Sequence, residues 1–305
     1  MLPAMTRVLV AGATGRLGRR IVPELKRRGY DVRAIVRPRS SLGPLARHVE
    51  RVVTADITDP ASLAGACRDV DVVVSCAGAA MTLGNAGDRS TFHQVDCVGN
   101  GNLLNEAEIA GVQRFVYVSV HYSGALRHTA YVEAHEDFVR RLTTSPIEYT
   151  VMRPTGYYSF FDDIVRLAAR GKVPIIGDGT ARTNPIHEQD LAEACVSAIE
   201  EPEQQEIELG GPAIYTREEI AELAFEALGR PMRTMKVPVS VLRAAGWAMR
   251  PFNARLAGLL EFGAMVSQVD AIAPRRGTRD LLWYFRTRAA VYLPASGAEA
   301  DAATP

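Results

Sequence analysis

The fold is decided by the stretch Val8-Leu9-Val10-Ala11-Gly12-Ala13-Thr14-Gly15-Arg16-Leu17-Gly18. The apolar run before Gly12 predicts a buried strand, and the apolar residues after Gly18 (Ile21, Val22, Leu25) keep helical spacing. Gly12 permits a tight turn, Gly15 lets the backbone approach a pyrophosphate, and Gly18 lets the helix pack close to the strand. Free N–H groups at the start of the helix would hold the phosphates. The residues of this turn that we expect at a dinucleotide are Gly12, Thr14, Gly15, Arg16, Leu17 and Gly18.

The composition is typical of a soluble globular protein. Of its 305 residues 47% are hydrophobic and 23% charged, and the 35 basic residues balance the 35 acidic ones. A net charge of zero gives no support for a nucleic-acid partner. The four cysteines form no C-x-x-C pair and indicate buried thiols in a reducing compartment. With no signal-peptide pattern and no run of about 18 apolar residues, a cytoplasmic location is expected.

Strands and helices alternate along the first half of the chain. After the first strand, further strands are expected at 31–36, 49–54, 70–75, 115–119 and 147–152. Repeated βα units with apolar strands predict an α/β fold, a Rossmann-type doubly wound parallel sheet with helices on both faces. A ligand should then bind at the carboxyl ends of the strands, where the strand order reverses.

The regular alternation loosens after residue 152. A helix is expected from Tyr157 to Arg170, a loop over 171–174, a helix over 190–200, a short strand and turn over 207–211, and mostly helical chain from Thr216. The predicted nucleotide-binding domain is 1–155, with 183–212 returning to it; 156–182 and 213–290 form a smaller, mostly helical substrate lobe, and 295–305 a disordered tail.

Cofactor choice depends on the residue that ends the second strand. A site selective for NAD places an acid there, which holds the ribose 2′-hydroxyl. This chain has Arg37, and a guanidinium suits the 2′-phosphate of NADP. Arg16 could add a second contact, although a basic loop exposed to solvent would look the same. The sequence favours NADP, with NAD less favoured.

Several ordered motifs follow the glycine turn. They are Ala55-Asp56-Ile57-Thr58-Asp59, Val95-Asp96-x-x-Gly99-Asn100-x-Asn102-Leu103-Leu104, Arg114-Phe115-Val116-Tyr117-Val118-Ser119, Arg153-Pro154-Thr155-Gly156, Pro185-Ile186-His187-x-x-Asp190-Leu191-Ala192 and Gly210-Gly211-Pro212. Together they resemble the atypical short-chain dehydrogenase/reductases, near the NmrA-like and complex I accessory-subunit branch, over about residues 6–290. The resemblance implies Asp56 and Ile57 beside the adenine, Ala77 and Gly78 beside the ribose, and Pro154 to Gly156 near the nicotinamide.

The resemblance also implies a catalytic tyrosine, with a lysine four residues later and a serine after the fifth strand. Tyr131 stands at the tyrosine position and Ser119 ends the strand, but the lysine is replaced by His135. On a helix Tyr131 and His135 share a face. A protonated His135 could favour the phenolate and bond the ribose, whereas in the alternative Tyr131 only packs and His135 only supports structure or cofactor.

Histidines and aromatic residues offer further candidates. His121, His128 and His135 recur every seven residues, but zinc needs three or four converging ligands, so no metal site is predicted. Asp190 is expected to cap the following helix, with His187 in the loop before it at the cofactor cleft. The predicted substrate-pocket residues are His121, Tyr157, Tyr158 and His187; aromatic residues at helical spacing could equally belong to the core.

The segment 239–266 alternates apolar residues with Arg243, Arg250 and Arg255. It reads as a pair of helices closing the substrate lobe, or as an amphipathic surface that rests on a membrane or a protein partner. The oligomeric state stays open.

The leading hypothesis is an NADP-dependent oxidoreductase that passes a hydride to a carbonyl or conjugated double bond of a fairly apolar small molecule. Ser119 would orient the substrate oxygen, Tyr131 would donate the proton, and His135 would position the ribose and the tyrosine. The alternative is a non-catalytic NAD(P)-binding redox sensor or assembly subunit, which the missing lysine supports. An epimerase or dehydratase of sugar nucleotides is less favoured, because the lysine is absent and the cleft is aromatic.

Overall fold

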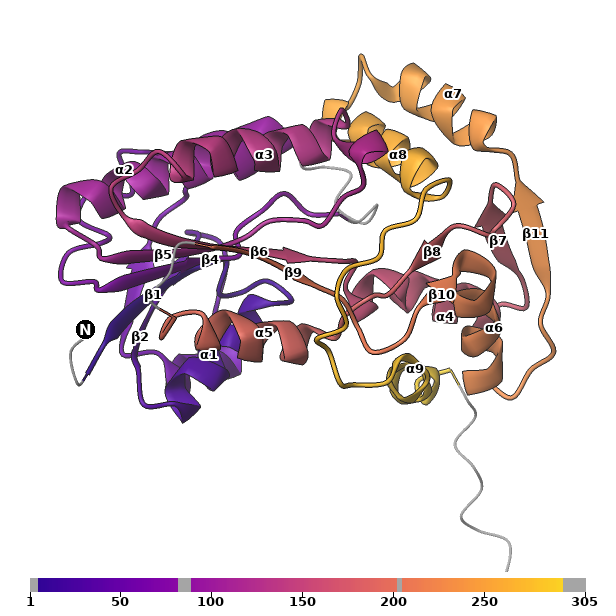
Figure 1. Cartoon of the computed structure of the whole chain (residues 1–305), viewed down its shortest axis with the longest axis horizontal. Helices are drawn as coiled ribbons and strands as arrows, with labels where there is room; N and C mark the ends of the chain where they lie inside the picture. Colours follow the sequence, from indigo (N-terminus) through magenta and orange to yellow (C-terminus); the bar gives the residue numbers. More distant parts are fainter. Residues whose placement is uncertain (1–4, 82–88, 202–204, 293–305) are drawn as a thin grey trace, which may run out of the picture.

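The computed structural model describes residues 5–81, 89–201 and 205–292. At their centre lies a parallel sheet of seven strands in the order β3-β2-β1-β4-β5-β6-β9 (Figure 1). The strands are β1 (Arg7–Ala11), β2 (Asp31–Val36), β3 (Arg51–Thr54), β4 (Val72–Ser75), β5 (Arg114–Val118), β6 (Glu148–Pro154) and β9 (Gln205–Leu209). The predicted doubly wound α/β fold is confirmed.

Helices cover both faces of the sheet. The helices α1 (Gly18–Arg27) and α5 (Glu188–Ser197) lie on one face, and α2 (Asn100–Ala110) and α3 (Ala130–Leu142) on the other (Figure 1). Side chains of a strand alternate between the two faces, so Val8 packs on the α1 side and Leu9 on the α3 side. The central strands β1, β4 and β5 are buried on both faces, which is why they contain continuous apolar runs, whereas the edge strands β3 and β9 are partly exposed.

The strand order reverses between β1 and β4. The two strands pair directly, with Ala11 opposite Ser75, while β1 pairs on its other side with β2. The segments that leave β1 and β4 therefore depart from the same edge of the sheet. A crevice at this edge is the position where open α/β sheets bind ligands.

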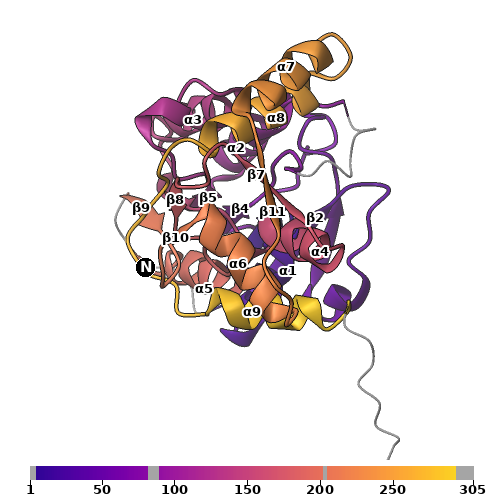
Figure 2. The same ribbon diagram turned by 90° about the vertical axis from the view of Figure 1, so that its right-hand side faces the viewer.

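A second, smaller group of elements lies beyond the carboxyl edge of the sheet (Figure 2). Its helices are α4 (Asp162–Ala169), α6 (Arg217–Ala227), α7 (Val239–Met249), α8 (Ala254–Val266) and α9 (Leu281–Ala289). The helices α4, α6 and α9 share an apolar core that includes Tyr158, Phe225 and Phe285. The helices α7 and α8 pack on each other, and α8 rests on α3.

Two short sheets in this lobe correct the prediction. The expected loop over 171–174 is wrong, because Val173 and Pro174 begin β7 (Val173–Ile176), which pairs with β11 (Thr234–Val237). The second sheet joins β8 (Arg182–Thr183) to β10 (Tyr215–Thr216). Each partner lies more than 30 residues away, so local sequence carries no signal for these pairs.

Some predicted boundaries shift. The helix expected from Tyr157 starts as the 3-10 turn η5 (Tyr158–Phe161) and continues as α4. The remaining short elements are η1 (Gly43–His48), the π-helical η3 (His93–Gly99) and η4 (Gly124–Leu126). The tail expected to be disordered, 295–305, lies outside the described residues. No helix among the described residues is long and apolar enough to span a membrane.

Candidate functional site

The glycine turn between β1 and α1 is tight because two of its glycines leave no room for a side chain. Gly12 has φ +85°, and a Cβ there would lie 2.7 Å from the Cys76 carbonyl oxygen. A Cβ on Gly18 would lie 2.2 Å from the Gly12 oxygen. Gly18 is buried beneath the turn, so it shapes the loop by packing, whereas Gly15 is exposed. The turn therefore presents bare backbone to the crevice, as phosphate binding requires.

A cavity of about 340 Å³ opens between this turn and the ends of β2, β3 and β4. It contains the following residues that the sequence assigns to the cofactor: Gly12, Thr14, Gly15, Arg37, Asp56, Ile57, Ala77 and Gly78. The Asp56 carboxylate accepts hydrogen bonds from the Thr58 amide (2.9 Å) and hydroxyl (2.8 Å), which hold the loop after β3 in place. The shape and lining suit the adenosine end of a dinucleotide.

A second cavity of about 340 Å³ continues the first toward β5 and α3. The two share Gly15, Arg37, Ala77 and Gly78, and the second adds Arg16, Leu17, Ser119, Tyr131 and His135. The structure thus brings ten of the predicted cofactor residues, all but Gly18, Pro154 and Gly156, and the three predicted catalytic residues to one continuous cleft.

Two arginines lie in this cleft. Arg37 is exposed just beyond the end of β2 and lines both cavities. Arg16 crosses from the glycine turn to η5, where its Nη1 donates to the Ser159 carbonyl (2.6 Å). The cleft has cationic side chains suited to the phosphates of a nucleotide.

Ser119 and Tyr131 both line the cofactor cleft and a third, apolar cavity beside it. The Ser119 Oγ is buried and has no hydrogen-bond partner among the described residues. Tyr131, on the first turn of α3, packs edge-on against Phe92 and Phe262, with ring centroids 5.3 and 5.0 Å away. Burial raises the pKa of the Tyr131 phenol, so it stays protonated at neutral pH.

His135 departs from the role expected for it. Its Nδ1 lies 2.6 Å from the Tyr117 hydroxyl, and its ring packs edge-on against Tyr131. Burial, with a smaller contribution from Arg153, lowers the pKa of His135 to about 3, so the imidazole is neutral at physiological pH. The expectation that a protonated His135 favours the phenolate is therefore wrong. Burial removes the imidazole from water and so disfavours its protonated form.

Asp96, on η3, is a cleft residue that the sequence reasoning did not single out. Its Oδ1 accepts from the Ala79 amide (3.1 Å) and lies 3.8 Å from the His135 Nε2, while its buried Oδ2 has no partner among the described residues. A Cβ on Gly78 would lie 2.6 Å from Oδ1. Burial raises the pKa of the Asp96 carboxyl. Its place in the quoted motif Val95-Asp96-x-x-Gly99 was the available signal.

The third cavity has a volume of about 230 Å³ and a mostly apolar lining. Its apolar residues include Leu126, Phe160, Phe161, Leu259, Phe262 and Val266, and the predicted residues His121, Tyr157, Pro154 and Gly156 also line it. Arg217 adds a guanidinium group to the wall of this cavity. Its Nη2 donates to the Val266 carbonyl (3.0 Å) at the end of α8, and burial lowers the pKa of Arg217 to about 10. The shape suits a largely apolar small molecule.

Two predicted substrate-pocket residues lie elsewhere. Tyr158 is fully buried in the core of the lobe, where its hydroxyl donates to the Arg279 carbonyl (2.5 Å). His187 packs against Tyr158 and Tyr284 and caps α5, with Nδ1 accepting from the Gln189 amide (3.0 Å). Asp190, expected as the cap, lies in the first turn instead and accepts from the Thr278 and Arg279 amides. Both pocket assignments and the cap assignment are therefore corrected.

The segment 239–266 forms the helices α7 and α8. The helix α8 faces inward and supplies Leu259, Phe262 and Val266 to the apolar cavity. The helix α7 and the turn after it face outward, with Trp247 76% and Phe252 73% exposed. One helix of the pair thus closes the pocket, and the other presents an apolar surface.

Known proteins match this chain in sequence and in fold. Residues 12–202 match the family described as NAD(P)H-binding. A chloroplastic divinyl chlorophyllide a 8-vinyl-reductase of Oryza sativa is 31% identical over 82% of this chain, which spans 65% of that protein's length. The photosystem II assembly factor Ycf39 of Trieres chinensis is 24% identical, and the match covers 87% of this chain and 80% of the length of that protein. The fold matches that of an Escherichia coli NADPH-dependent quinone oxidoreductase complexed with NADPH (TM-score 0.73, 20% identity, 92% and 99% of the two chains).

Proposed function

The chain belongs to the NAD(P)H-binding family, among the atypical short-chain dehydrogenase/reductases, and from this premise we propose that it is an NADP-dependent reductase. Its substrate would be a fairly apolar small molecule with a carbonyl or a conjugated double bond. The observation that carries the proposal is the position of Ser119 and Tyr131. Both line the cofactor cleft and the apolar cavity at once, so a substrate in the cavity would touch both.

The cleft fits a dinucleotide on its own features. The glycine turn leaves a cradle that a Cβ would fill, and the adenosine and nicotinamide ends form one continuous cleft. Arg37, at the end of β2 where NAD-selective sites carry an acid, supports NADP over NAD. Gly12, Thr14 and Gly15 would hold the phosphates, and Pro154 and Gly156 would lie near the nicotinamide. When bound, NADPH would supply the hydride.

The residues of this chain would handle the oxygen and the proton. The Ser119 hydroxyl, which has no partner within 5–81, 89–201 and 205–292, would donate a hydrogen bond to the substrate oxygen and so polarise the carbonyl. Tyr131 would pass its phenolic proton to the oxygen of a carbonyl substrate. In a substrate with a conjugated double bond, the proton would go to the carbon next to the carbonyl group. A protonated phenol is a donor rather than a base, which favours reduction over oxidation. His135, as a neutral imidazole, and Asp96 would position Tyr131 and the ribose.

A second candidate is a non-catalytic NAD(P)-binding sensor or assembly subunit. It is supported by the absence of the lysine and by the exposed Trp247 and Phe252, which a protein or membrane partner would cover. The relative from Trieres chinensis is a photosystem II assembly factor, so this family includes proteins named for assembly. The substrate lobe would then serve as a docking platform.

The two candidates are separated by binding and turnover. We would first titrate the protein with NADPH, NADP⁺, NADH and NAD⁺ by calorimetry, and then follow NADPH oxidation with quinones, enones and apolar aldehydes. Tight NADPH binding with turnover of one class supports the reductase. Preference for the oxidised nucleotides with no turnover supports the sensor. No binding of any nucleotide contradicts both.

A further inference from the structure

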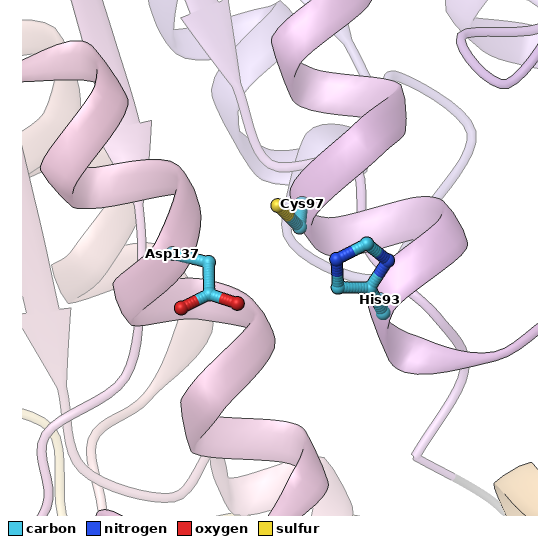
Figure 3. Close-up of side chains that lie close together, drawn as sticks. All are labelled: His93, Cys97 and Asp137. Atoms are coloured by element: carbon cyan, nitrogen blue, oxygen red, sulfur yellow. The ribbon is translucent and has the colours of Figure 1, made fainter.

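Three side chains of ligand type meet on the outer side of the cleft wall, between η3 and α3 (Figure 3). His93 and Cys97 come from η3, and Asp137 comes from α3. Their ligand atoms all lie within 4.8 Å of one another. Figure 3 shows the imidazole, the sulfur and the carboxylate directed into the gap between the two helices. This group does not include His121, His128 and His135, the histidines that recur every seven residues in the sequence.

We propose that His93, Cys97 and Asp137 bind a zinc ion. A thiolate, an imidazole and a carboxylate are the three ligand types that zinc accepts in proteins, and this mixture is too soft for magnesium or calcium. Three protein ligands leave a fourth tetrahedral position, which water fills because His93 is exposed. When the sulfur–zinc bond forms, the thiol proton of Cys97 leaves to solvent.

The geometry requires only a small closure. Zinc bond lengths near 2.0–2.3 Å place tetrahedral ligand atoms about 3.3–3.6 Å apart. The ligand atoms start within 4.8 Å of one another, and His93 is exposed while Cys97 and Asp137 are half-buried, so binding would need the three side chains to rotate toward a common point. Residues four apart in the π-helical η3 project from nearly the same side, which already aligns His93 with Cys97.

Arg140 competes for the carboxylate. It forms an ion pair with the Asp137 Oδ1, and the Arg140 side chain is 63% exposed. An exposed ion pair between residues three apart on a helix contributes little to stability. A divalent cation that His93 and Cys97 also hold would therefore displace Arg140 from Asp137, or bind the other carboxylate oxygen.

A zinc ion here would join the two elements that line the nucleotide cleft from this side. The segment η3 also carries Asp96, and α3 also carries Tyr131 and His135. The ligands themselves lie outside the cleft, so zinc would act as a clamp rather than as a reactant. The site stands on its own geometry, and it holds whether or not the chain is a reductase.

The test is a titration of the metal-free, tag-free protein with Co²⁺, followed by displacement with Zn²⁺. We expect one equivalent of Co²⁺ to produce a thiolate-to-cobalt charge-transfer band that Zn²⁺ removes. Loss of an outer-shell partner already weakens metal binding about 10–100-fold. Cys97→Ser should therefore abolish the band, and His93→Gln and Asp137→Asn should each weaken Zn²⁺ binding at least about tenfold. Saturating Zn²⁺ should raise the Tm of the native protein by about 3 °C or more.

Matched controls separate this site from incidental binding. Asp163→Asn removes a carboxylate that pairs with Arg166 three residues on, as Asp137 does with Arg140, and His128→Gln removes another exposed histidine. Both should bind Zn²⁺ like the native protein. A native protein without the band, a band that survives in Cys97→Ser, or equal binding by the His93 and Asp137 variants and their controls overturns the proposal.

Discussion

The His135 imidazole, which lines the cleft, is anchored to Tyr117, whose hydroxyl lies 2.6 Å from Nδ1. Both side chains are buried, and burial keeps the imidazole neutral by lowering its pKa to about 3. The position four residues after Tyr131 therefore offers a fixed, uncharged partner. A reductase built this way would depend on the Tyr131 proton and the Ser119 hydrogen bond, without a nearby cation on that turn of α3.

Replacing Tyr131 with phenylalanine tests the proton donor. Tyr131→Phe should lower turnover about 10²–10⁴-fold, because a positioned general acid contributes that much, while NADPH affinity stays nearly unchanged. The measurement is steady-state NADPH oxidation with an active acceptor, beside calorimetric NADPH binding. Tyr292→Phe, in an exposed side chain after α9, is the control. Unchanged turnover in Tyr131→Phe would remove the residue from the mechanism.

Cofactor selectivity is tested at Arg37. Arg37→Ala should weaken NADPH binding about tenfold or more and leave NADH binding unchanged, because a charge-assisted hydrogen bond to the 2′-phosphate is lost. Arg39→Ala removes an equally exposed arginine two residues further on and should change neither affinity. If both nucleotides weaken equally in Arg37→Ala, the guanidinium does not read the 2′-phosphate.

The packing of the glycine turn is tested at Gly18. Gly18→Ala would place a Cβ 2.2 Å from the Gly12 oxygen, so the turn or α1 must shift. We expect a loss of about 1–3 kcal/mol in the free energy of unfolding, together with weaker nucleotide binding. Urea denaturation measures the first and calorimetry the second. Gly124→Ala, where a Cβ meets open space, is the control. Native stability in Gly18→Ala would contradict the close packing.

Acid stability should depend on Glu24. Its buried carboxylate bonds to Arg27 (2.6 Å) and Arg28 (2.9 Å), and the hydrogen bond with Arg27 lowers the pKa of Glu24 below its ordinary 4.5. A lowered folded-state pKa means that the stabilisation is present above pH 4.5 and is lost as the pH falls through the folded-state value. Glu24→Gln should lower the free energy of unfolding by about 1 kcal/mol at pH 7.

The pH series gives the decisive comparison for Glu24. The stability difference between the native protein and Glu24→Gln should shrink as the pH drops below 4.5. Glu222→Gln, on an exposed position of α6, should behave like the native protein throughout. A difference that stays constant down to pH 3 would show that packing, not the charge, carries the effect.

The exposed surface of α7 and of the turn after it is tested with the double variant Trp247→Ser, Phe252→Ser. We expect unchanged NADPH binding and turnover, because neither side chain lines the cleft, and a loss of sedimentation with anionic lipid vesicles. Val291→Ser, which alters an exposed apolar residue beyond α9, is the control. If the native protein does not sediment with vesicles, the result contradicts a membrane contact and favours a protein partner at this surface.

The sequence alone determined the sheet and the nucleotide cleft. Five strands after β1 could be predicted because each contains a local apolar run, which is largely buried in β2, β4, β5 and β6 but exposed in the edge strand β3. The spacing of Gly12, Gly15 and Gly18 indicates the turn between β1 and α1. These are properties of neighbouring residues. The residues assigned to the adenosine end were implied by the resemblance to a family, and the structure places them in one cavity.

Only the tertiary structure decided the features that depend on distant partners. The pairing of β7 with β11, the hydrogen bonds from the Thr278 and Arg279 amides to Asp190, and the burial of Tyr158 in the lobe core each need a contact from another part of the chain. The same holds for His135, whose neutral state follows from its burial, with a smaller contribution from Arg153. Spacing along a chain reports which side chains share a face, but burial and protonation depend on what packs against that face, which only the folded chain determines.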